Sequence, residues 1–499
     1  MSQEFEAVIG MEVHVESKTQ SKMFCSCKND LGLETIPNTN ICPICTAQPG
    51  TLPVPNREAL VKLARFGKAL NCRIADYTWF ERKSYFYPDL PKGYQITQYE
   101  RPLCYDGRLE IETSERQKNI RITRIHMEED TGKLSHAGGT TKSLVDYNRA
   151  GIPLMELVTE PDIRSAEEAR VFCEELQMIL RYLDISDADM ERGQMRCEVN
   201  ISLRVKGTET FGTKVEIKNL NSFRAVENSI LYETIRQAQV IESGEAVIQE
   251  TRGWDDVKGQ TFSQRKKENA HDYRYFIEPD IPPFETSEIQ AEASRGISEL
   301  PFAKRKRFME EYGLTDQQVR ALVREKSVAN YYEATVSELL EWYRSKHTEV
   351  FEPELDSGYI KLRKLATNYL LTELLRLFAD KDISFDAPVI TPENYAEFIT
   401  IVGSGEISSS AAQTVLSVMV ETGGDPSEII DSQGLRQVND TEALLTVVKS
   451  VISANPEVVE TYRGGNSNSI QFLVGQVMKQ TKGSANPQIA RQLLEEQLG

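Results

Sequence analysis

Hydrophobic and polar residues alternate at a period of two in several short runs of the first 290 residues. This alternation predicts strands with one apolar and one polar face, over residues 9–16, 121–130, 196–205 and 213–222. Residues 165–183 instead repeat apolar positions at helical spacing, and Ser165 with Glu168 forms a capping box at the start. Because helices do not regularly separate the strands, we predict an α+β fold rather than a doubly wound sheet.

The strand pattern ends at a proline-rich stretch, "IEPDIPPFE" (277–285), which suits a domain boundary. Helix start signals follow it, including a Thr315-to-Gln318 capping box and Pro392 directly after Thr391. We therefore predict three parts: a mixed or antiparallel sheet domain over 1–290, an all-α helical domain over 295–405, and a small helical tail domain over 410–499.

Composition and charge bound the possible functions. The chain has 499 residues, too many for one compact core, and its 40% hydrophobic and 27% charged residues are typical of globular proteins. No apolar run approaches the roughly 18 residues needed to cross a membrane, and the acidic start does not resemble a secretory signal. We expect a cytoplasmic protein with no membrane partner. A net charge of −18 argues against nonspecific coating of nucleic acid but permits a local basic patch.

Four of the eight cysteines are clustered, as Cys25-x-Cys27 and Cys42-x2-Cys45. Two close pairs separated by a short loop can present four thiolates to one tetrahedral zinc ion, and a site with four protein ligands is closed and structural. The first pair is tighter than the usual x2 spacing, and two pairs of incidental thiols are the alternative. Pair spacing and an intracellular setting, where disulfides are rare, favour zinc in the loop 25–45.

Acidic residues recur on the polar faces of the predicted strands. Glu12, His14 and Glu16 share one face of the first strand, and a buried row of this kind is costly unless a cation neutralises it. Further acids follow along the chain, at Glu128, Glu129, Asp130, Glu156, Glu198 and Glu216, with His126 among them. Any one of these acids is more simply explained as solvent-exposed. The whole set favours a hard divalent ion, Mg2+ or Mn2+, bridging to nucleotide phosphates.

Other segments carry weaker signals. The tracts 82–98 and 271–280 interleave Tyr and Phe with Arg and Lys, which suits stacking on a base or, equally, an ordinary loop with aromatic anchors. The basic run "FAKRKRF" (302–308) suits contact with RNA, although a solvated helix face is favoured. The sequence has no GxxxxGK[ST] loop, no GxGxxG and no kinase motif set, so any ATP site is of an unusual type. No nucleophile with a positioned base is recognisable.

Several long motifs, in order, resemble one known family, the B subunits of the tRNA-dependent amidotransferases. They are "IGMEVHVE", "NTNICPICTAQPGTLPVPN", "RKSYFYPDLPKGYQITQ", "RIHMEEDTGK", "NRAGIPLMELVTEPDIRS", "KNLNSFRAVE", "DYRYFIEPDIPP" and "FLVGQVMKQTKGSANPQ". The resemblance runs from residue 5 to the C-terminus. It implies a cradle-shaped domain, a helical domain and a tail that contacts tRNA.

The resemblance also implies an amide-forming ligase. ATP would phosphorylate the side-chain carboxylate of a misacylated Glu-tRNA(Gln) and/or Asp-tRNA(Asn), and ammonia would then displace phosphate to give Gln-tRNA or Asn-tRNA. The ammonia would come from a separate amidase subunit, with a small third subunit linking the two in a heterotrimer. This division of labour would explain why the chain carries no recognisable nucleophile.

The resemblance assigns residues to roles. It implies magnesium ligands at His14, Glu129 and Glu156, catalytic acids Glu12 and Glu128 beside them, and further ligands at Glu198 and Glu216. It implies ATP contacts at Lys83, Tyr87 and Arg274, and a structural zinc ion on the four cysteines. Two alternatives stay open: a non-catalytic tRNA-binding module of a larger complex, and an independent ATP-dependent kinase of a free carboxylic acid.

Overall fold

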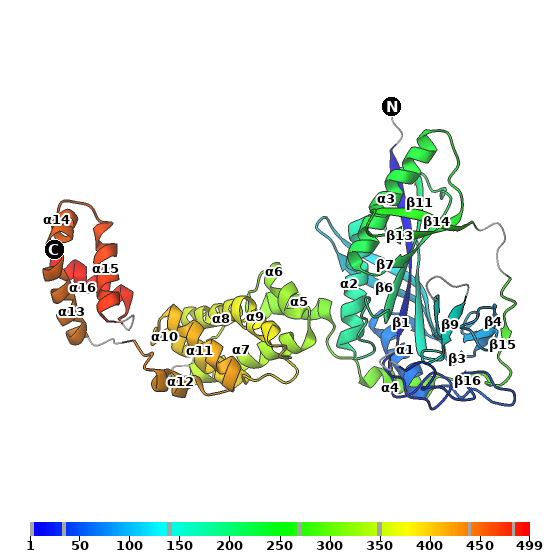
Figure 1. Ribbon diagram of the computed structural model, residues 1–499, viewed down its shortest axis with the longest axis horizontal. Coiled ribbons are helices and arrows are strands. Elements are labelled where there is room, and N and C mark those ends of the chain that lie inside the picture. Colours follow the sequence, from blue (N-terminus) through cyan, green and yellow to red (C-terminus); the bar gives the residue numbers. More distant parts are fainter. Residues whose placement is uncertain are drawn as a thin grey trace. The chain divides into compact units, whose positions relative to one another are not determined.

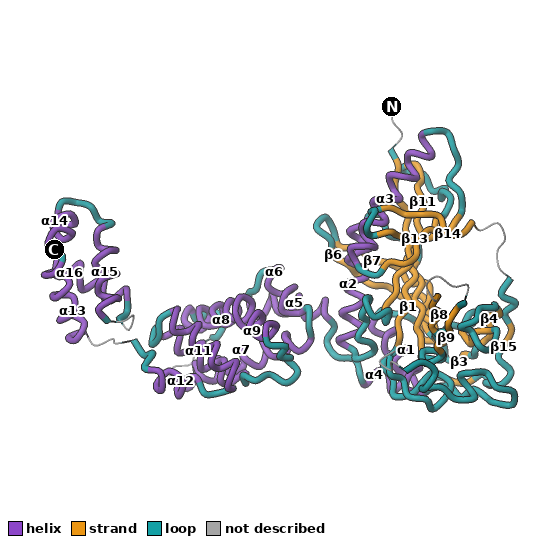
Figure 2. The backbone as a smooth tube through the Cα atoms, in the orientation of Figure 1, coloured by secondary structure: helices purple, strands orange, loops and turns teal. Residues whose placement is uncertain are grey.

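The computed structural model describes residues 4–31, 36–136, 142–266, 272–346, 352–437, 441–481 and 485–499. The chain divides into two compact units, Met1–Pro301 and Phe302–Gly499 (Figure 1). Every strand within the described ranges lies in the first unit, whereas the second unit contains helices (Figure 2). The α+β expectation is therefore confirmed. In those same ranges no helix is long and apolar enough to cross a membrane.

A nine-stranded sheet, ordered β14-β13-β12-β11-β1-β10-β7-β6-β2, forms the centre of the first unit. All neighbouring strands are antiparallel except β12 and β13, which are parallel. The strands are β1 (Phe5–Glu16), β2 (Arg73–Ile74), β6 (Cys104–Glu112), β7 (Gln117–Glu129), β10 (Pro153–Thr159), β11 (Met195–Val205), β12 (Val215–Leu220), β13 (Glu250–Asp255) and β14 (Gln260–Lys266). The four runs that alternate in the sequence lie on β1, β7, β11 and β12, so those strand predictions are confirmed.

Helices cover one face of this sheet because the strands turn their apolar side chains toward it. These helices are α1 (Arg57–Ala69), α2 (Ala166–Tyr182) and α3 (Phe223–Glu242), and α4 (Ser287–Arg295) packs on α1. Met11, Val13 and Val15 of β1 are fully buried in the core that results. The Ser165 hydroxyl caps α2 by accepting from Glu168 N, as predicted, but the Glu168 carboxylate accepts from Arg164 N, so the predicted capping box is half formed. The opposite face of the sheet is left to polar side chains.

Smaller sheets complete the first unit. One is ordered β15-β4-β5, and two pairs are β16-β3 and β8-β9. Their bounds are β3 (Tyr77–Thr78), β4 (Glu81–Ser84), β5 (Tyr94–Thr97), β8 (Lys133–His136), β9 (Ser143–Asp146), β15 (Phe276–Ile277) and β16 (Phe284–Glu285). Strand β5 contacts β7 of the large sheet. The side chain of Gln98, just after β5, accepts a hydrogen bond from Met127 N of β7 at 3.2 Å.

The second unit packs its helices around aromatic side chains, among them Tyr332, Tyr395, Phe378 and Phe398, all fully buried. Its elements are α5 (Pro301–Tyr312), α6 (Asp316–Val323), α7 (Lys326–Lys346), α8 (Ser357–Tyr369), the π-helical turn η1 (Leu370–Leu374), α9 (Leu375–Asp380), α10 (Pro392–Ser404), α11 (Ser409–Thr422), α12 (Pro426–Gln433), α13 (Thr441–Ala454), α14 (Pro456–Arg463), α15 (Ser469–Gln480) and α16 (Pro487–Leu498).

Two groups of helices can be distinguished in this unit. Helix α11 contacts α9 and α10, and α12 contacts α10 and α11, so this packing continues past the predicted boundary at residue 405. Helices α13 to α16 share a separate apolar core that includes Leu444, Leu473 and Leu494. The division into a helical domain and a tRNA-binding tail stays a prediction.

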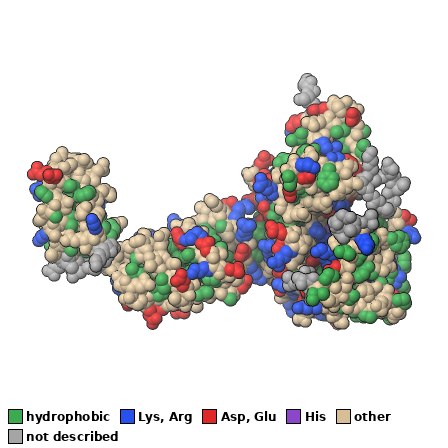
Figure 3. All heavy atoms as spheres, in the orientation of Figure 1, with side chains coloured by type: hydrophobic (Ala, Val, Ile, Leu, Met, Phe, Trp, Pro, Cys, Tyr) green, Lys and Arg blue, Asp and Glu red, His purple; other side chains and the backbone are tan. Residues whose placement is uncertain are grey.

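The basic run at 302–308 is only partly exposed to solvent. Lys304 and Arg305 are buried, and the Lys304 Nζ lies 2.6 Å from Glu333 Oε2 of α7. Arg307 Nη2 lies 2.6 Å from the other oxygen of the same carboxylate. Lys304 and Arg307 therefore fix α5 on α7, and the expectation of a solvated helix face is wrong for the buried Lys304 and Arg305. Contact of this run with RNA stays a prediction. On the face drawn in Figure 3, acidic and basic side chains are interspersed.

Candidate metal and nucleotide site

Strand register brings the predicted acids together on the polar face of the large sheet. The central strand β1 pairs Glu12 with Glu198 of β11, and His14 with Glu156 of β10. On the next strand, β7, His126 stands opposite Glu156. Side chains directly opposite on antiparallel strands lie about 4.5–5.5 Å apart at Cβ. Residues that are up to about 200 positions apart in sequence therefore form one cluster.

The ligand atoms in this cluster lie close enough to share cations. His14 Nε2 is 3.5 Å from Glu156 Oε2, 3.8 Å from Glu128 Oε1 and 3.9 Å from Glu12 Oε1. His126 Nε2 is 3.6 Å from Glu156 Oε2 and 3.7 Å from Glu128 Oε2. Three overlapping sets each hold their ligand atoms within 4.8 Å of one another: Glu12–His14–Glu156, His126–Glu128–Glu156 and Glu12–Glu198–Glu216.

The cluster lines a cavity of about 450 Å³ that also receives basic side chains. These are Lys83, Arg124, Arg196 and Lys218. Arg196 Nη2 lies 2.6 Å from Asp130 Oδ2, and Lys218 Nζ lies 2.8 Å from Glu198 Oε2. Arg124 is less completely paired, since its Nη2 is 3.5 Å from Glu156 Oε1 and its buried Nε has no hydrogen-bond partner. The cavity thus offers places for both cations and anions.

The pKa values in the cavity record this crowding of charge. Burial and the neighbouring carboxylates of Glu156 and Glu198 raise the pKa of Glu12 to about 6. Burial disfavours charge on the His14 ring, but the nearby carboxylates of Glu156, Glu128 and Glu12 outweigh it and raise its pKa to about 9. Burial likewise opposes ionisation of Glu156, yet the two histidines hold the pKa of that carboxyl well below its usual range.

The residues present fit a hard divalent cation. Carboxylate oxygens with an imidazole nitrogen are a suitable donor set for Mg2+ or Mn2+, and thiolates are absent from the three acidic sets. Without such a cation, the neighbouring carboxylates raise the pKa values of Glu12 and His14, so both groups keep a proton to a higher pH than usual. A divalent ion would replace those protons.

Glu129, which the resemblance assigned as a magnesium ligand, does not reach this cavity. It follows Glu128 on β7, and successive side chains of a strand point to opposite faces. Its carboxylate accepts a hydrogen bond from Ile96 N at 3.0 Å and lies 2.7 Å from Lys92 Nζ. It lines a different cavity of about 270 Å³, together with Cys45. The placement of Glu129 beside His14 and Glu156 is therefore wrong, and Glu128 occupies that position.

The parity of β7 would have identified Glu128. Ile125 and Met127 are fully buried on the apolar face, and Glu129 has their parity. The opposite parity carries Arg124, His126 and Glu128 into the cavity. Sequence reasoning therefore missed Arg124 as a site residue, and it included His126 only as a member of the acidic set.

The three residues assigned to ATP lie around a second, adjoining cavity of about 690 Å³. Tyr87 and Arg274 line only this second cavity. Lys83, Tyr85 and Tyr273 line both the second cavity and the acidic cavity. Burial opposes the charge of Lys83, but the carboxylates of Glu128 and Glu156 raise the pKa of its ammonium group. His271, the first residue of the second aromatic tract, lies outside the described residues.

Aromatic rings stand at the edge of the acidic cavity. Tyr99 and Tyr275 both line it and stack on each other, with ring centroids 4.3 Å apart and planes inclined by 10°. The Arg124 guanidinium lies 6.0 Å from the centroid of Tyr99. Flat aromatic surfaces next to cationic groups suit a nucleobase and its phosphates.

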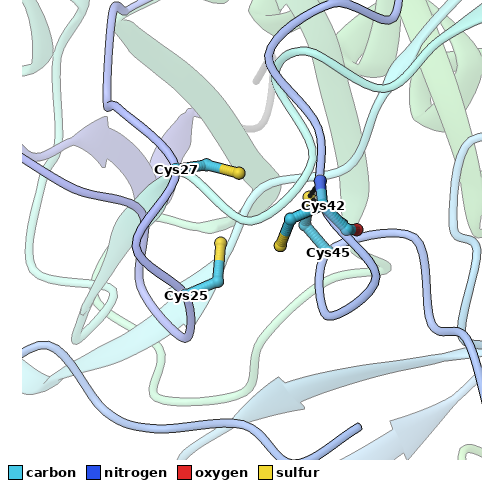
Figure 4. A group of neighbouring side chains, drawn as sticks. All are labelled: Cys25, Cys27, Cys42 and Cys45. Atoms are coloured by element: carbon cyan, nitrogen blue, oxygen red, sulfur yellow. Dashed lines mark hydrogen bonds between the residues drawn. The ribbon is translucent and has the colours of Figure 1, made fainter.

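The four clustered cysteines form a separate group, with sulfurs from two loops facing one another (Figure 4). The sulfurs of Cys25, Cys27, Cys42 and Cys45 all lie within 4.8 Å of one another, and all four thiols are free. In a tetrahedral site with zinc–sulfur bonds of about 2.3 Å, neighbouring sulfurs are about 3.8 Å apart. The cluster can therefore bind a metal ion such as zinc after small shifts.

Polar groups favour a thiolate at Cys45, whereas burial and the neighbouring sulfurs raise the pKa values of Cys25 and Cys27. The pKa of Cys45 falls to about 5, because hydrogen bonds from the Cys25 thiol and from Cys42 N, together with the charge of Lys22, outweigh burial. Lys22 is itself buried, with its Nζ 3.9 Å from Cys45 Sγ and donating to Asn40 O at 3.0 Å. A buried cation beside the sulfurs offsets part of the negative charge of a four-thiolate metal centre.

Comparisons with known proteins identify the family to which the chain belongs. The family described as "GatB/GatE catalytic domain" matches residues 7–292, and the "GatB domain" matches residues 349–498. The chain therefore belongs to the GatB/GatE family.

Its relatives extend over the full length of the chain. The B subunit of the aspartyl/glutamyl-tRNA(Asn/Gln) amidotransferase of Caldicellulosiruptor bescii is 47% identical over 499 residues, covering 99% of each chain. The protein of the same name from Carboxydothermus hydrogenoformans is 46% identical over 501 residues, again covering 99% of each. That of Persephonella marina is 45% identical over 496 residues, covering 99% of this chain and 100% of the relative.

Proposed function

We propose that this chain is the B subunit of an aspartyl/glutamyl-tRNA(Asn/Gln) amidotransferase, a ligase that works with partner subunits. It converts Glu-tRNA(Gln) and/or Asp-tRNA(Asn) to the amidated forms in an ATP-dependent reaction. Full-length similarity to relatives of that name supports the reaction class. One observation supports the chemistry most strongly: the acids of β1, β7 and β10 and two histidines meet in one cavity that also contains basic side chains.

The reaction has two steps. The substrate carboxylate attacks the γ-phosphorus of ATP, the bond from that phosphorus to ADP breaks, and an acyl phosphate forms. Ammonia then attacks the carbonyl carbon, the bond to the phosphoryl oxygen breaks, and phosphate leaves as the amide forms. The attacking carboxylate is ionised at neutral pH, so the first step needs no general base. It does need positive charge to bring one anion to another.

The cavity residues divide this work by charge. His14, Glu128 and Glu156 are the proposed cation ligands, and Glu12 lies beside them. Glu198 and Glu216 belong to the neighbouring set, which also contains Glu12. A bound Mg2+ would withdraw charge from the transferring phosphoryl group. Lys83 and Arg124 are the proposed donors to anionic oxygens, because each lines the cavity and carries a positive charge there. Tyr87 and Arg274 are proposed to contact the nucleotide from the adjoining cavity.

Glu129 is left out of the proposed ligand set, because Lys92 and Ile96 N hold its carboxylate on the other face of β7. The cysteine cluster is proposed to carry structural zinc, since four protein ligands leave no open position for a substrate. We further propose a cytoplasmic heterotrimer with an amidase subunit and a small linker subunit. Residues 410–499 are proposed to contact tRNA.

A single assay separates this function from its alternatives. The purified assembly receives free ammonium, ATP, Mg2+ and misacylated tRNA, with the amidase subunit inactivated. We expect amidation that disappears when Glu128→Gln is introduced. Tight tRNA binding without ATP turnover would favour a tRNA-binding module, and turnover with free glutamate or aspartate would favour an independent carboxylate kinase.

A further inference from the structure

The cysteine loop is connected to the acidic cavity by a continuous set of hydrogen bonds. The connection begins at residues 36–40, which lead into Cys42, and passes through residues 145–151, from the end of β9 to just before β10. It ends at residues 130–132, directly after β7. Each of these three segments is described by the structure.

Two asparagines join the cysteine loop to the middle segment. Asn38 N donates to Asp146 Oδ1 at 3.0 Å, its side-chain amide donates to Val145 O at 3.0 Å, and its side-chain oxygen accepts from Tyr147 N at 2.8 Å. Asn40 N donates to Asn148 Oδ1 at 2.9 Å. Asn148 completes the junction by donating from Nδ2 to Ile36 O at 2.7 Å. The Asn148 side chain is buried, so both of its amide groups are committed to this contact.

Asn40 also joins the two halves of the cysteine loop, which carry Cys25 and Cys27 and Cys42 and Cys45. The Asn40 side-chain amide donates to Lys28 O at 2.8 Å, just beyond Cys27. The backbone carbonyl of Asn40 accepts from the buried Lys22 ammonium group, which also lies beside Cys45. Hydrogen bonds therefore link the surroundings of the cysteines to Asn40, and Asn40 to Asn148.

The middle segment in turn holds the end of β7. Arg149 donates from Nε to Thr131 O at 3.0 Å and from Nη2 to Gly132 O at 2.9 Å. Gly151 N donates to Asp130 O, and Asp130 N donates to Ile152 O, both at 2.9 Å. Gly151 adopts φ +87, and a Cβ there would lie 3.7 Å from both Cys45 Cβ and Lys22 Cδ, so the segment packs closely against the cysteine loop.

We infer that the cysteine loop is a positioning element for the acidic cavity, acting through Asn40 and Asn148 on Asp130 and the adjoining ends of β7 and β10. Asp130 lines the cavity, and Glu128 and Glu156 lie within a few residues of the clamped ends. Fully satisfied polar networks hold their members rigidly, and such distant support sets the geometry of a metal site. The inference rests on the proposed cation site and adds a role for residues outside it.

The experiment compares the full chain with Asn148→Ala and with the zinc-site variant Cys42→Ser. Asn119→Ala is the matched control, because Asn119 is an exposed asparagine on β7 itself. Three quantities are measured: zinc content, exchange rates of the Asp130 and Gly151 amide protons, and Mn2+ affinity by electron paramagnetic resonance. Asn148→Ala is expected to retain zinc, to exchange these amides about tenfold faster and to bind Mn2+ roughly tenfold more weakly, as for two lost hydrogen bonds.

Cys42→Ser is expected to lose zinc and to show the same two changes, whereas Asn119→Ala should match the unmodified chain. Unchanged amide exchange and Mn2+ affinity in zinc-free Cys42→Ser would overturn the inference. If Asn148→Ala does not fold, thiol blocking of the unmodified chain with a mercurial, followed by its reversal, supplies the same comparison. If the unmodified chain binds no Mn2+ in the cavity, the proposed cation site fails, while amide exchange still decides whether the loop positions β7.

Discussion

Glu128 and Glu129 are adjacent, chemically identical and predicted to differ sharply in function. Glu128 lies 3.8 Å from His14 Nε2 in the acidic cavity, whereas Glu129 is paired with Lys92 on the other face. Substituting each in turn by Gln removes one negative charge from the same strand with little change of shape. The pair is therefore a matched test of which face of β7 binds the cation.

The expected loss of Mn2+ affinity follows from the charge that is removed. Two unit charges about 4 Å apart interact by about 4 kcal/mol at an effective dielectric constant of roughly 20. Water entering the altered site recovers part of this energy, so we expect Glu128→Gln to cost about 2 kcal/mol, or roughly 30-fold in Mn2+ affinity. Glu129→Gln should leave the affinity within about twofold, and its cost should fall on stability, because the Lys92 ammonium group loses its ionic partner.

The assay is a Mn2+ titration of the full chain, followed by electron paramagnetic resonance at constant pH and ionic strength. Thermal unfolding of each variant provides the control for general destabilisation. Equal losses of Mn2+ affinity in the two variants, or a loss confined to Glu129→Gln, would refute the assignment of the cavity to the Glu128 face.

Three further predictions concern pH, zinc and the tail. Folding raises the pKa of His14 from 6.5 to about 9, so the protonated ring stabilises the metal-free fold fully below about pH 6.5. The melting temperature of the metal-free chain should therefore fall as the pH rises to about 9. Saturating Mg2+ should reduce this fall. Metal analysis of Cys42→Ser should show loss of zinc together with lower thermal stability, and retained stoichiometric zinc would contradict the site. Deleting residues 438–499, which carry the separate core of α13 to α16, should raise KM for tRNA with little effect on glutamine hydrolysis, and unchanged tRNA use would contradict a tRNA-binding role for α13 to α16.

The first strand shows how far sequence patterns reach. Apolar Met11, Val13 and Val15 alternate with Glu12 and His14, so the buried and polar faces of β1 follow from the sequence alone, and the structure confirms them. The convergence of β1, β7, β10 and β11 depends on strand order and register, which period-two alternation does not contain.

The two features that were misassigned have different physical causes. Choosing Glu129 over Glu128 ignored the parity set by Ile125 and Met127, and a shift of one residue on a strand moves a side chain to the opposite face. The basic run at 302–308 looked solvated because charged residues usually are. Glu333 of α7, 29 residues later, supplies the partner for Lys304, and no local pattern indicates that contact.

Anomalous diffraction from a crystal of the assembly, grown with Mn2+ and a non-hydrolysable ATP analogue, tests the central claim most directly. We predict a manganese peak within bonding distance of His14, Glu128 and Glu156, with the nucleotide phosphates beside Lys83 and Arg124. A peak at Glu129, or nucleotide density away from this cavity, would contradict the account.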